Sequence, residues 1–142
     1  IEDIIYGPDN SRRSFGFFTG PGKWREQAVA TEVMIDLLPD PREGATVLRE
    51  QRGEKGFGVF AYRFKGRNGW PVIMAWNAGE GEVEQEFEVA AKDVTLVDML
   101  GRTESLQPSG GKVKVMLSEA PLYVVPRPKA EVDAIVNDVG LN

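Results

Sequence analysis

Carboxylic acids are the side chains of this sequence whose types and spacing could do chemistry. Candidate pairs exist by number alone, such as Asp98 with Glu104, or Glu32 with Asp36 on one face of an expected helix. Paired carboxyl groups hydrolyse glycosides when about 5–5.5 Å or about 6.5–9.5 Å separates them across a cleft. Asp98, however, directly precedes the turn Met99–Gly101, where a carboxylate commonly accepts backbone N–H bonds. We therefore expect a structural role for Asp98, and we assign no catalytic pair.

Glutamates occupy every second position of the segment Glu82–Val89. This row invites interpretation as a calcium site, but ligands about 7 Å apart along a flat strand cannot converge on one ion. A solvated outer face is the better interpretation. Because Lys112 and Lys114 alternate with valines in the same manner, we expect a cross-strand ladder of glutamates and lysines.

The composition excludes several classes of function. The chain contains no histidine and no cysteine, which removes Ser-His-Asp and Cys-His catalysis, disulfides and Cys-ligated zinc. Its 142 residues carry 17 Lys+Arg against 22 Asp+Glu, a formal charge of −5, which argues against nucleic acid as a partner. No run of about 18 apolar residues is present to span a membrane. The glycine-rich segment Gly53–Gly58 lacks the spacing of a dinucleotide-binding loop, so we expect no cofactor and no metal.

Aromatic side chains provide the remaining candidates for binding. An exposed indole can stack on the apolar face of a sugar ring, and Trp70 follows the turn Asn68–Gly69, where exposure is common. A sugar-binding platform would combine Trp70 with Tyr62 or Trp24. Burial is nevertheless the ordinary state of such large apolar rings, and Trp76, at the end of its strand, fits packing in a core.

A helix is expected near the start of the chain. The segment Lys23–Leu38 has no glycine or proline and stops at Pro39. Two apolar rows run along it at spacing four: Val29, Val33, Leu37 and Ala30, Met34, Leu38. With Trp24, Ala28 and Ile35 added, the stripe is wider than packing on one side needs. The helix therefore lies on a sheet, or it is wedged between two layers, one of them absent from this chain.

From residue 45 onward the hydrophobic period is two, which predicts strands. Eight are expected: Ala45–Gln51, Phe57–Lys65, Trp70–Asn77, Glu82–Val89, Val94–Leu100, Arg102–Leu106, Lys112–Leu117 and Leu122–Val125. The Asn68–Gly69 dipeptide favours a tight hairpin between the second and the third. Because no helix separates the strands, a parallel crossover sheet is excluded. The pattern predicts a mainly β fold, an antiparallel two-sheet sandwich of Greek-key or jelly-roll kind, with a short C-terminal helix over Lys129–Val139.

Three stretches resemble the C-terminal segment of retaining glycoside hydrolases, in which a small β-sandwich follows a TIM-barrel catalytic domain. They are the helix Trp24–Ala30 leading to Met34–Leu38, the strand pair Phe60–Phe64 and Pro71–Asn77, and the closing strands Val94–Gly101, Gly111–Leu117 and Ala120–Val125. The resemblance runs from Lys23 to Val125 and implies a non-catalytic sandwich, with Pro121 and Tyr123 on an edge strand. The catalytic glutamates of such enzymes lie on barrel strands, and no residue here aligns with them.

The resemblance and the pattern together divide the chain into three parts. Residues 1–40 form an N-terminal segment with the bridging helix 23–38, residues 41–127 the sandwich, and residues 128–142 a helical tail. Since the chain begins at Ile1 and shows no targeting segment, we expect it to be a piece of a longer protein, and its compartment cannot be read from it.

Three hypotheses for function remain open. The first is an accessory sandwich that braces a catalytic barrel through an apolar patch of Phe17, Trp24 and Val29. The second is a carbohydrate-binding module that uses Trp70, Tyr62 and Trp24. The third is a stand-alone structural or assembly domain.

Overall fold

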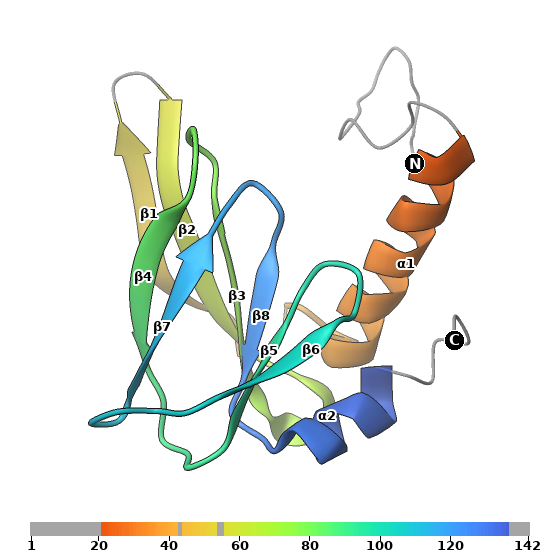
Figure 1. Cartoon of the computed structure of the whole chain (residues 1–142), viewed down its shortest axis with the longest axis vertical. Helices are drawn as coiled ribbons and strands as arrows, with labels where there is room; N and C mark the ends of the chain where they lie inside the picture. Colours follow the sequence, from red (N-terminus) through yellow and green to blue (C-terminus); the bar gives the residue numbers. More distant parts are fainter. Residues whose placement is uncertain (1–20, 43, 54–55, 137–142) are drawn as a thin grey trace.

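Figure 1 shows the computed structural model, which describes residues 21–42, 44–53 and 56–136, with the backbone alone for residues 21–25, 51–53 and 56–57. In chain order the elements are α1 (Pro21–Leu37), β1 (Thr46–Gly53), β2 (Gly56–Lys65), the 3-10 turn η1 (Arg67–Gly69), β3 (Pro71–Asn77), β4 (Val83–Glu88), β5 (Val94–Val97), β6 (Thr103–Leu106), β7 (Lys112–Leu117), β8 (Leu122–Val125) and α2 (Lys129–Val136). The described residues thus confirm the predicted mainly β class.

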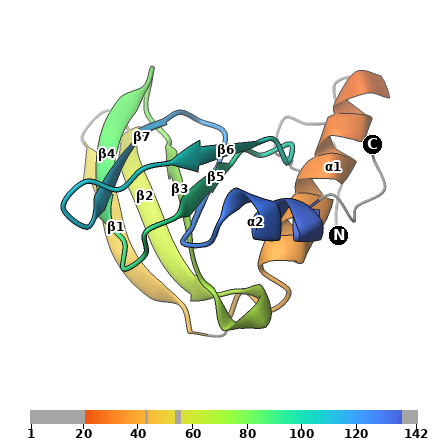
Figure 2. The same ribbon diagram turned by 60° about the horizontal axis from the view of Figure 1, so that its bottom comes forward.

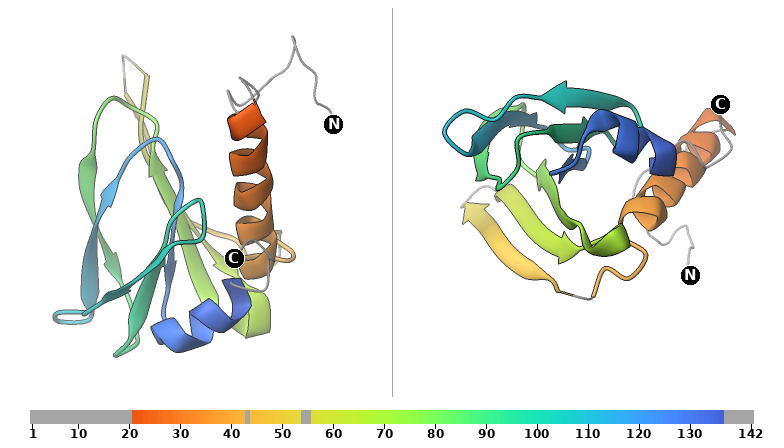
Figure 3. Two further views of the ribbon diagram at one scale, coloured as in Figure 1. Left: turned by 45° about the vertical axis from the view of Figure 1, so that its right-hand side comes forward. Right: turned by 90° about the horizontal axis from the view of Figure 1, so that it is seen from below.

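The strands form two antiparallel sheets. Six of them pair in the order β1-β2-β3-β8-β5-β6, and the other two form the ribbon β4-β7. Seen from below, the larger sheet curls around the ribbon, whereas the two helices lie on the opposite side (Figure 3). The predicted antiparallel β-sandwich is therefore confirmed, with a helical layer added on its outer face.

The first core fills the space between the two sheets. Its buried members are Val59, Ala61, Ile73, Ala75, Phe87, Val94, Val113, Val115, Leu117 and Val124. The strand β7 alternates strictly between exposed and buried residues, because only one of its faces meets this core. Its alternation is thus the direct result of a ribbon with one solvated side.

The second core lies between the outer face of the larger sheet and the two helices. Its buried members are Val33, Leu37, Leu38, Val72, Val97, Tyr123, Val125, Val132 and Val136. The central strands β3 and β8 contribute to both cores, so consecutive residues such as Val72 and Ile73 are both buried. Near-continuous apolar runs are typical of strands covered on both faces.

The predicted edge position of Pro121 and Tyr123 is wrong. The strand β8 lies between β3 and β5 in the middle of the larger sheet, and Tyr123 is 3% exposed. An edge strand would have one unpaired row of backbone groups, whereas β8 bonds on both sides. The apolar character of both faces of β8 is the physical reason for its central place.

The predicted helices are present with small shifts of their ends. The helix α1 places Val33, Leu37 and the following Leu38 in the second core, while Ile35 points away and is 49% exposed. The helix α2 buries Val132 and Val136, and the predicted residues beyond Val136 lie outside the described ones. Among the described residues, no helix combines the length and the apolar character needed to cross a bilayer.

Two turns differ from the predicted segments. The strand expected over Val94–Leu100 ends at Val97, because Asp98 starts a hydrogen-bonded turn. The β2–β3 connection is longer than a two-residue hairpin, since the ladder ends at the pair Lys65–Pro71. Within it Asn68 adopts a positive φ of 60°, a conformation that asparagine tolerates better than most residues.

Replacing Gly101 by alanine should destabilise the fold by about 2–3 kcal/mol. Its φ is +89°, and an added Cβ would lie 3.1 Å from both Val33 Cγ2 and Val136 Cγ1, on the two helices. The matched control is Gly69→Ala, which has a similar φ of +76° but no atom within 4 Å of the new Cβ. Urea denaturation should show that the control loses about 1 kcal/mol of unfolding free energy. Equal losses in both variants would mean that the two helices move apart at no cost to make room for the added methyl group.

Stability should fall as the pH rises from about 10 to about 12. Burial raises the pKa of the Tyr123 phenol from 10.0 to about 12. In this interval the unfolded chain releases the proton while the folded chain keeps it, so up to about 3 kcal/mol of stability disappears. Urea denaturation across this range should show the loss in the native chain and a smaller one in Tyr123→Phe. Identical slopes for both proteins would contradict the assignment to Tyr123.

Candidate functional site

A cleft of about 790 Å³ opens at the end of the sandwich where β3 begins and β8 ends. Figure 2 turns this end of the ribbon forward. The floor of the cleft is made by Ile73 and Val124 from the inner face of the larger sheet. Its walls are made by the start of β3, the segment that follows β4, the turn before β7 and the segment that follows β8. Four chain segments that are far apart in sequence thus meet at one opening.

Three cations and one acid line this opening. They are Arg63, Lys112, Arg127 and Glu88. Arg63 lies opposite Ile73 in the β2–β3 register, which is an inward-facing position at the mouth of the first core. Lys112 Nζ lies 3.7 Å from Glu86 Oε1, a loose and half-exposed ion pair. Such a pair contributes little to stability, at most about 1 kcal/mol.

Arg127 is held in place by three elements. Its Nε and Nη2 donate to Glu131 Oε1 at 2.9 and 2.6 Å, and its guanidinium carbon lies 5.4 Å from the ring centroid of Trp70. Its backbone carbonyl accepts a hydrogen bond of 2.8 Å from the fully buried Thr95 hydroxyl. The side chain is therefore fixed at the mouth of the cleft before any ligand arrives.

The structure places Trp70 and Tyr62 at different sites. Trp70 lines the cleft and also packs against the second core. Tyr62 lies on the outer face of β2, with its ring centroid 5.9 Å from that of Trp76, and its hydroxyl hydrogen-bonds Glu50. Tyr62 pairs with Met74, four residues beyond Trp70, which corresponds to about 13 Å along a strand. Trp76 in turn stacks on Phe60 at 5.4 Å.

Only one member of the expected apolar patch can be placed with its side chain. Val29 is partly buried and packs inward against the second core. Trp24 belongs to α1, but its side chain lies outside the described part of the chain, and so does the whole of Phe17. A sugar-binding or barrel-binding role of Trp24 or Phe17 therefore stays a prediction.

The expected structural role of Asp98 is confirmed. Its Oδ1 accepts hydrogen bonds from the backbone N–H groups of Leu100 and Arg102, both at 2.9 Å, and its Oδ2 accepts one of 2.7 Å from Arg102 Nε. These bonds close the turn that joins β5 to β6. Both oxygens of this carboxylate are thus used by its own turn.

The other acidic residues that the sequence singled out lie at the surface. Glu104 and Glu32 are exposed, and the carbonyl oxygen of Asp36 accepts a hydrogen bond from Arg67. Within the parts of the chain that the structure describes, no three acidic side chains gather as metal ligands would.

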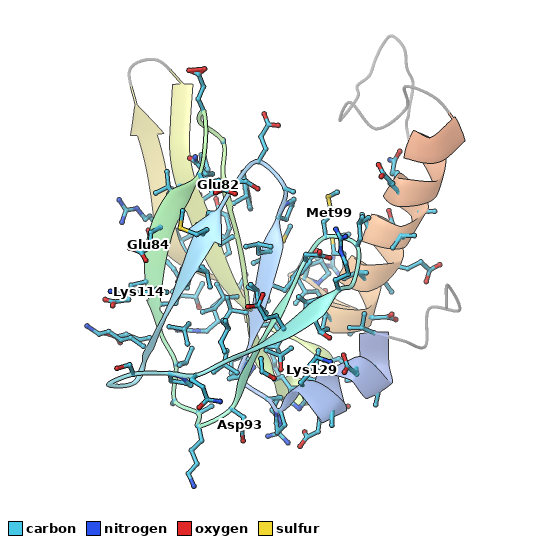
Figure 4. The ribbon with its side chains drawn as sticks, in the orientation of Figure 1. Glu82, Glu84, Asp93, Met99, Lys114 and Lys129 are labelled. Atoms are coloured by element: carbon cyan, nitrogen blue, oxygen red, sulfur yellow. The ribbon has the colours of Figure 1, made fainter. Side chains whose placement is uncertain are left out.

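The predicted ladder of glutamates and lysines is confirmed on the ribbon. The register pairs Glu86 with Lys114 and Glu88 with Lys112. Figure 4 shows Glu84 and Lys114 projecting from the same side of β4 and β7. This face therefore has the character of a solvated surface.

Sequence reasoning missed the cations of the cleft. Arg63 occupies an inward-facing position within the alternating segment Phe60–Phe64, where a packed strand would carry an apolar residue. That break in the pattern was a usable signal for Arg63. No such signal existed for Lys112 and Arg127, which join the cleft only through the fold.

No protein-family model and no curated protein matches this chain. Among solved structures, the chain is similar to a family 39 glycoside hydrolase from the gut symbiont Bacteroides cellulosilyticus WH2, at 19% sequence identity and a TM-score of 0.43. The similarity covers 58% of this chain and 17% of that one, so the chain matches only a small part of the hydrolase.

Replacing Asp98 by alanine should cost about 1–2 kcal/mol, because two backbone N–H groups lose their acceptor. Asp98→Asn keeps an oxygen at Oδ1 but replaces Oδ2 by an NH2 donor, so it loses the charge pair and the hydrogen bond with Arg102 Nε. Because the Arg102 side chain is 78% exposed and can turn to solvent, the cost should stay below about 1 kcal/mol. Urea denaturation distinguishes the two variants. An asparagine variant as unstable as the alanine variant would show that the charge, and not the acceptor, holds the turn.

Proposed function

We propose that this chain is a non-catalytic accessory β-sandwich of a glycoside-hydrolase-like protein, and that it braces a catalytic barrel by packing against it. The sequence resemblance to such sandwiches from Lys23 to Val125 supports this function. The role that the structure gives Asp98 also supports it, because this candidate carboxylate is engaged in holding a turn.

The observation that carries the proposal is an exposed isoleucine on the outer side of α1. One side of this helix is fully buried, with Val33 and Leu37 both at 0% exposure. Ile35, on the opposite side, is 49% exposed. Figure 3 shows that one long flank of α1 is turned away from the sheet. A large apolar side chain opposite the buried side of a helix is suited to a contact with a second layer, and the sandwich supplies the first.

Further exposed apolar residues lie at the beginning of β1, the strand that follows α1 in the chain. Val47 is 58% and Leu48 37% exposed, at the beginning of β1. Burying such surface against a partner stabilises a complex by about 25 cal/mol per Å². We expect the barrel to cover Ile35 together with this first part of β1.

The test is the affinity between this chain and the barrel of its parent protein, produced separately and measured by isothermal titration calorimetry. Ile35→Glu should weaken the association by about tenfold or more, because it places a charge in an apolar contact. The thermal stability of the variant chain should be unchanged, since Ile35 points away from the core.

Met116→Glu is the matched control. Met116 is 50% exposed, as Ile35 is, but it lies on the ribbon strand β7. Its substitution should leave the affinity within about twofold of the native value. Equal losses for both variants would contradict the proposed surface. A parent protein without a barrel-type catalytic domain would overturn the proposal and favour a stand-alone structural domain.

A further inference from the structure

We propose that the cleft at the end of the sandwich binds a saccharide that carries a carboxylate, with the carboxylate held by Arg63. This inference does not rest on the bracing role, because the cleft uses none of the surface assigned to the barrel. It also differs from a flat platform of Trp70 with Tyr62, which lie at separate sites.

Arg63 is the group that selects an anion. Its side chain is exposed at the mouth of the cleft, and it makes no hydrogen bond or ion pair with the described residues. A guanidinium presents its donors in a planar fork that matches the two oxygens of a carboxylate. A carboxylate that enters the cleft therefore finds a complete bidentate partner.

The neighbouring charges favour the same ligand. Arg127 and Lys112 line the opening with Arg63, and Glu88 is the one acid among the described residues that line it. Arg127 already pairs with Glu131 and Lys112 loosely with Glu86, so neither cation is as available as Arg63. The carboxylate consequently belongs at Arg63, and the two other cations add a favourable local potential.

The remaining surface suits the ring and the hydroxyl groups of a sugar. Trp70 and Pro71 give the cleft an apolar wall against which a sugar ring can lie. At Gly110 a side chain would meet nothing within 4 Å, so a ligand can approach the backbone there. The volume of about 790 Å³ lies within the range of small-molecule sites, about 300–1,000 Å³.

An acidic peptide is the less favoured ligand. Extended peptides commonly bind by adding a strand to the edge of a sheet. The edges of the larger sheet, β1 and β6, contribute no lining residue to the cleft. Both strands of the ribbon β4-β7 are edges, but the cleft meets them only at their terminal residues Glu88 and Lys112, so a peptide would find no length of strand edge to extend there.

Trigalacturonate is a suitable probe, and its fully methyl-esterified form is the matched neutral ligand. Isothermal titration of the whole chain should show saturable binding of the acid, with the ester bound about tenfold more weakly or not at all. Binding should also weaken as the salt concentration rises. Absence of binding up to about 10 mM acid, or equal affinity for acid and ester, would overturn the proposal.

Variants assign the effect to Arg63. Arg63→Ala should weaken binding of the acid by about tenfold or more, and Arg63→Lys should weaken it less, because it keeps the charge but loses the fork. Lys114→Ala removes an exposed cation of β7 outside the cleft and should leave the affinity within about twofold. Unfolding temperatures equal to the native one would show that Arg63→Ala acts on binding. An affinity for the acid that is unchanged in Arg63→Ala would overturn the assignment.

A hexaglutamate peptide provides the last arm of the experiment. It carries carboxylates without sugar rings, so we expect it to bind at least about tenfold more weakly than trigalacturonate. Equal or tighter binding of the peptide, lost in Arg63→Ala, would overturn the saccharide assignment and make the cleft a site for acidic protein segments.

Discussion

Burial of the larger sheet on both of its faces is the constraint on which the rest of this structure depends. The strands β3 and β8 bring apolar side chains to each face, so neither the ribbon nor the helices alone would cover them. Strands of this kind are stable only when both sides are removed from water. The ribbon β4-β7 covers one face, and the helices α1 and α2 cover the other. The result is three layers that enclose two cores.

This layering also decides where binding groups can lie. The faces of the central strands are occupied, so polar side chains gather where strands end and connections begin. Arg63 lies at an inward-facing position near the end of β2, and Arg127 lies two residues after the end of β8. The buried hydroxyl of Thr95 ties that last connection to β5. The cleft is thus a product of strand ends, and its walls come from segments that no local pattern relates to one another.

Periodicity in the sequence predicted the elements well and their neighbours less well. The alternation of Lys112–Leu117 fixes which residues face inward, and the structure agrees. Periodicity could not show where β8 lies in the sheet, because a short apolar strand has the same sequence pattern at an edge and in the centre. Its position is determined by pairing with strands that are far away in the sequence. The turn at Asp98 was predictable because its hydrogen bonds are local. The cleft was not, since it depends on how four distant segments meet.

The short helix α2 has a mechanical consequence for the molecule. It packs against α1 as well as against β5 and β6, and its Asp133 is anchored to Thr103 on β6 and to Lys129 within the helix. These two bonds lower the pKa of the Asp133 carboxyl, so the anchor is charged at neutral pH. The helix α2 therefore connects α1 to the edge half of the larger sheet. A partner that binds α1 would depend on the packing of these eight residues as well as on α1 itself.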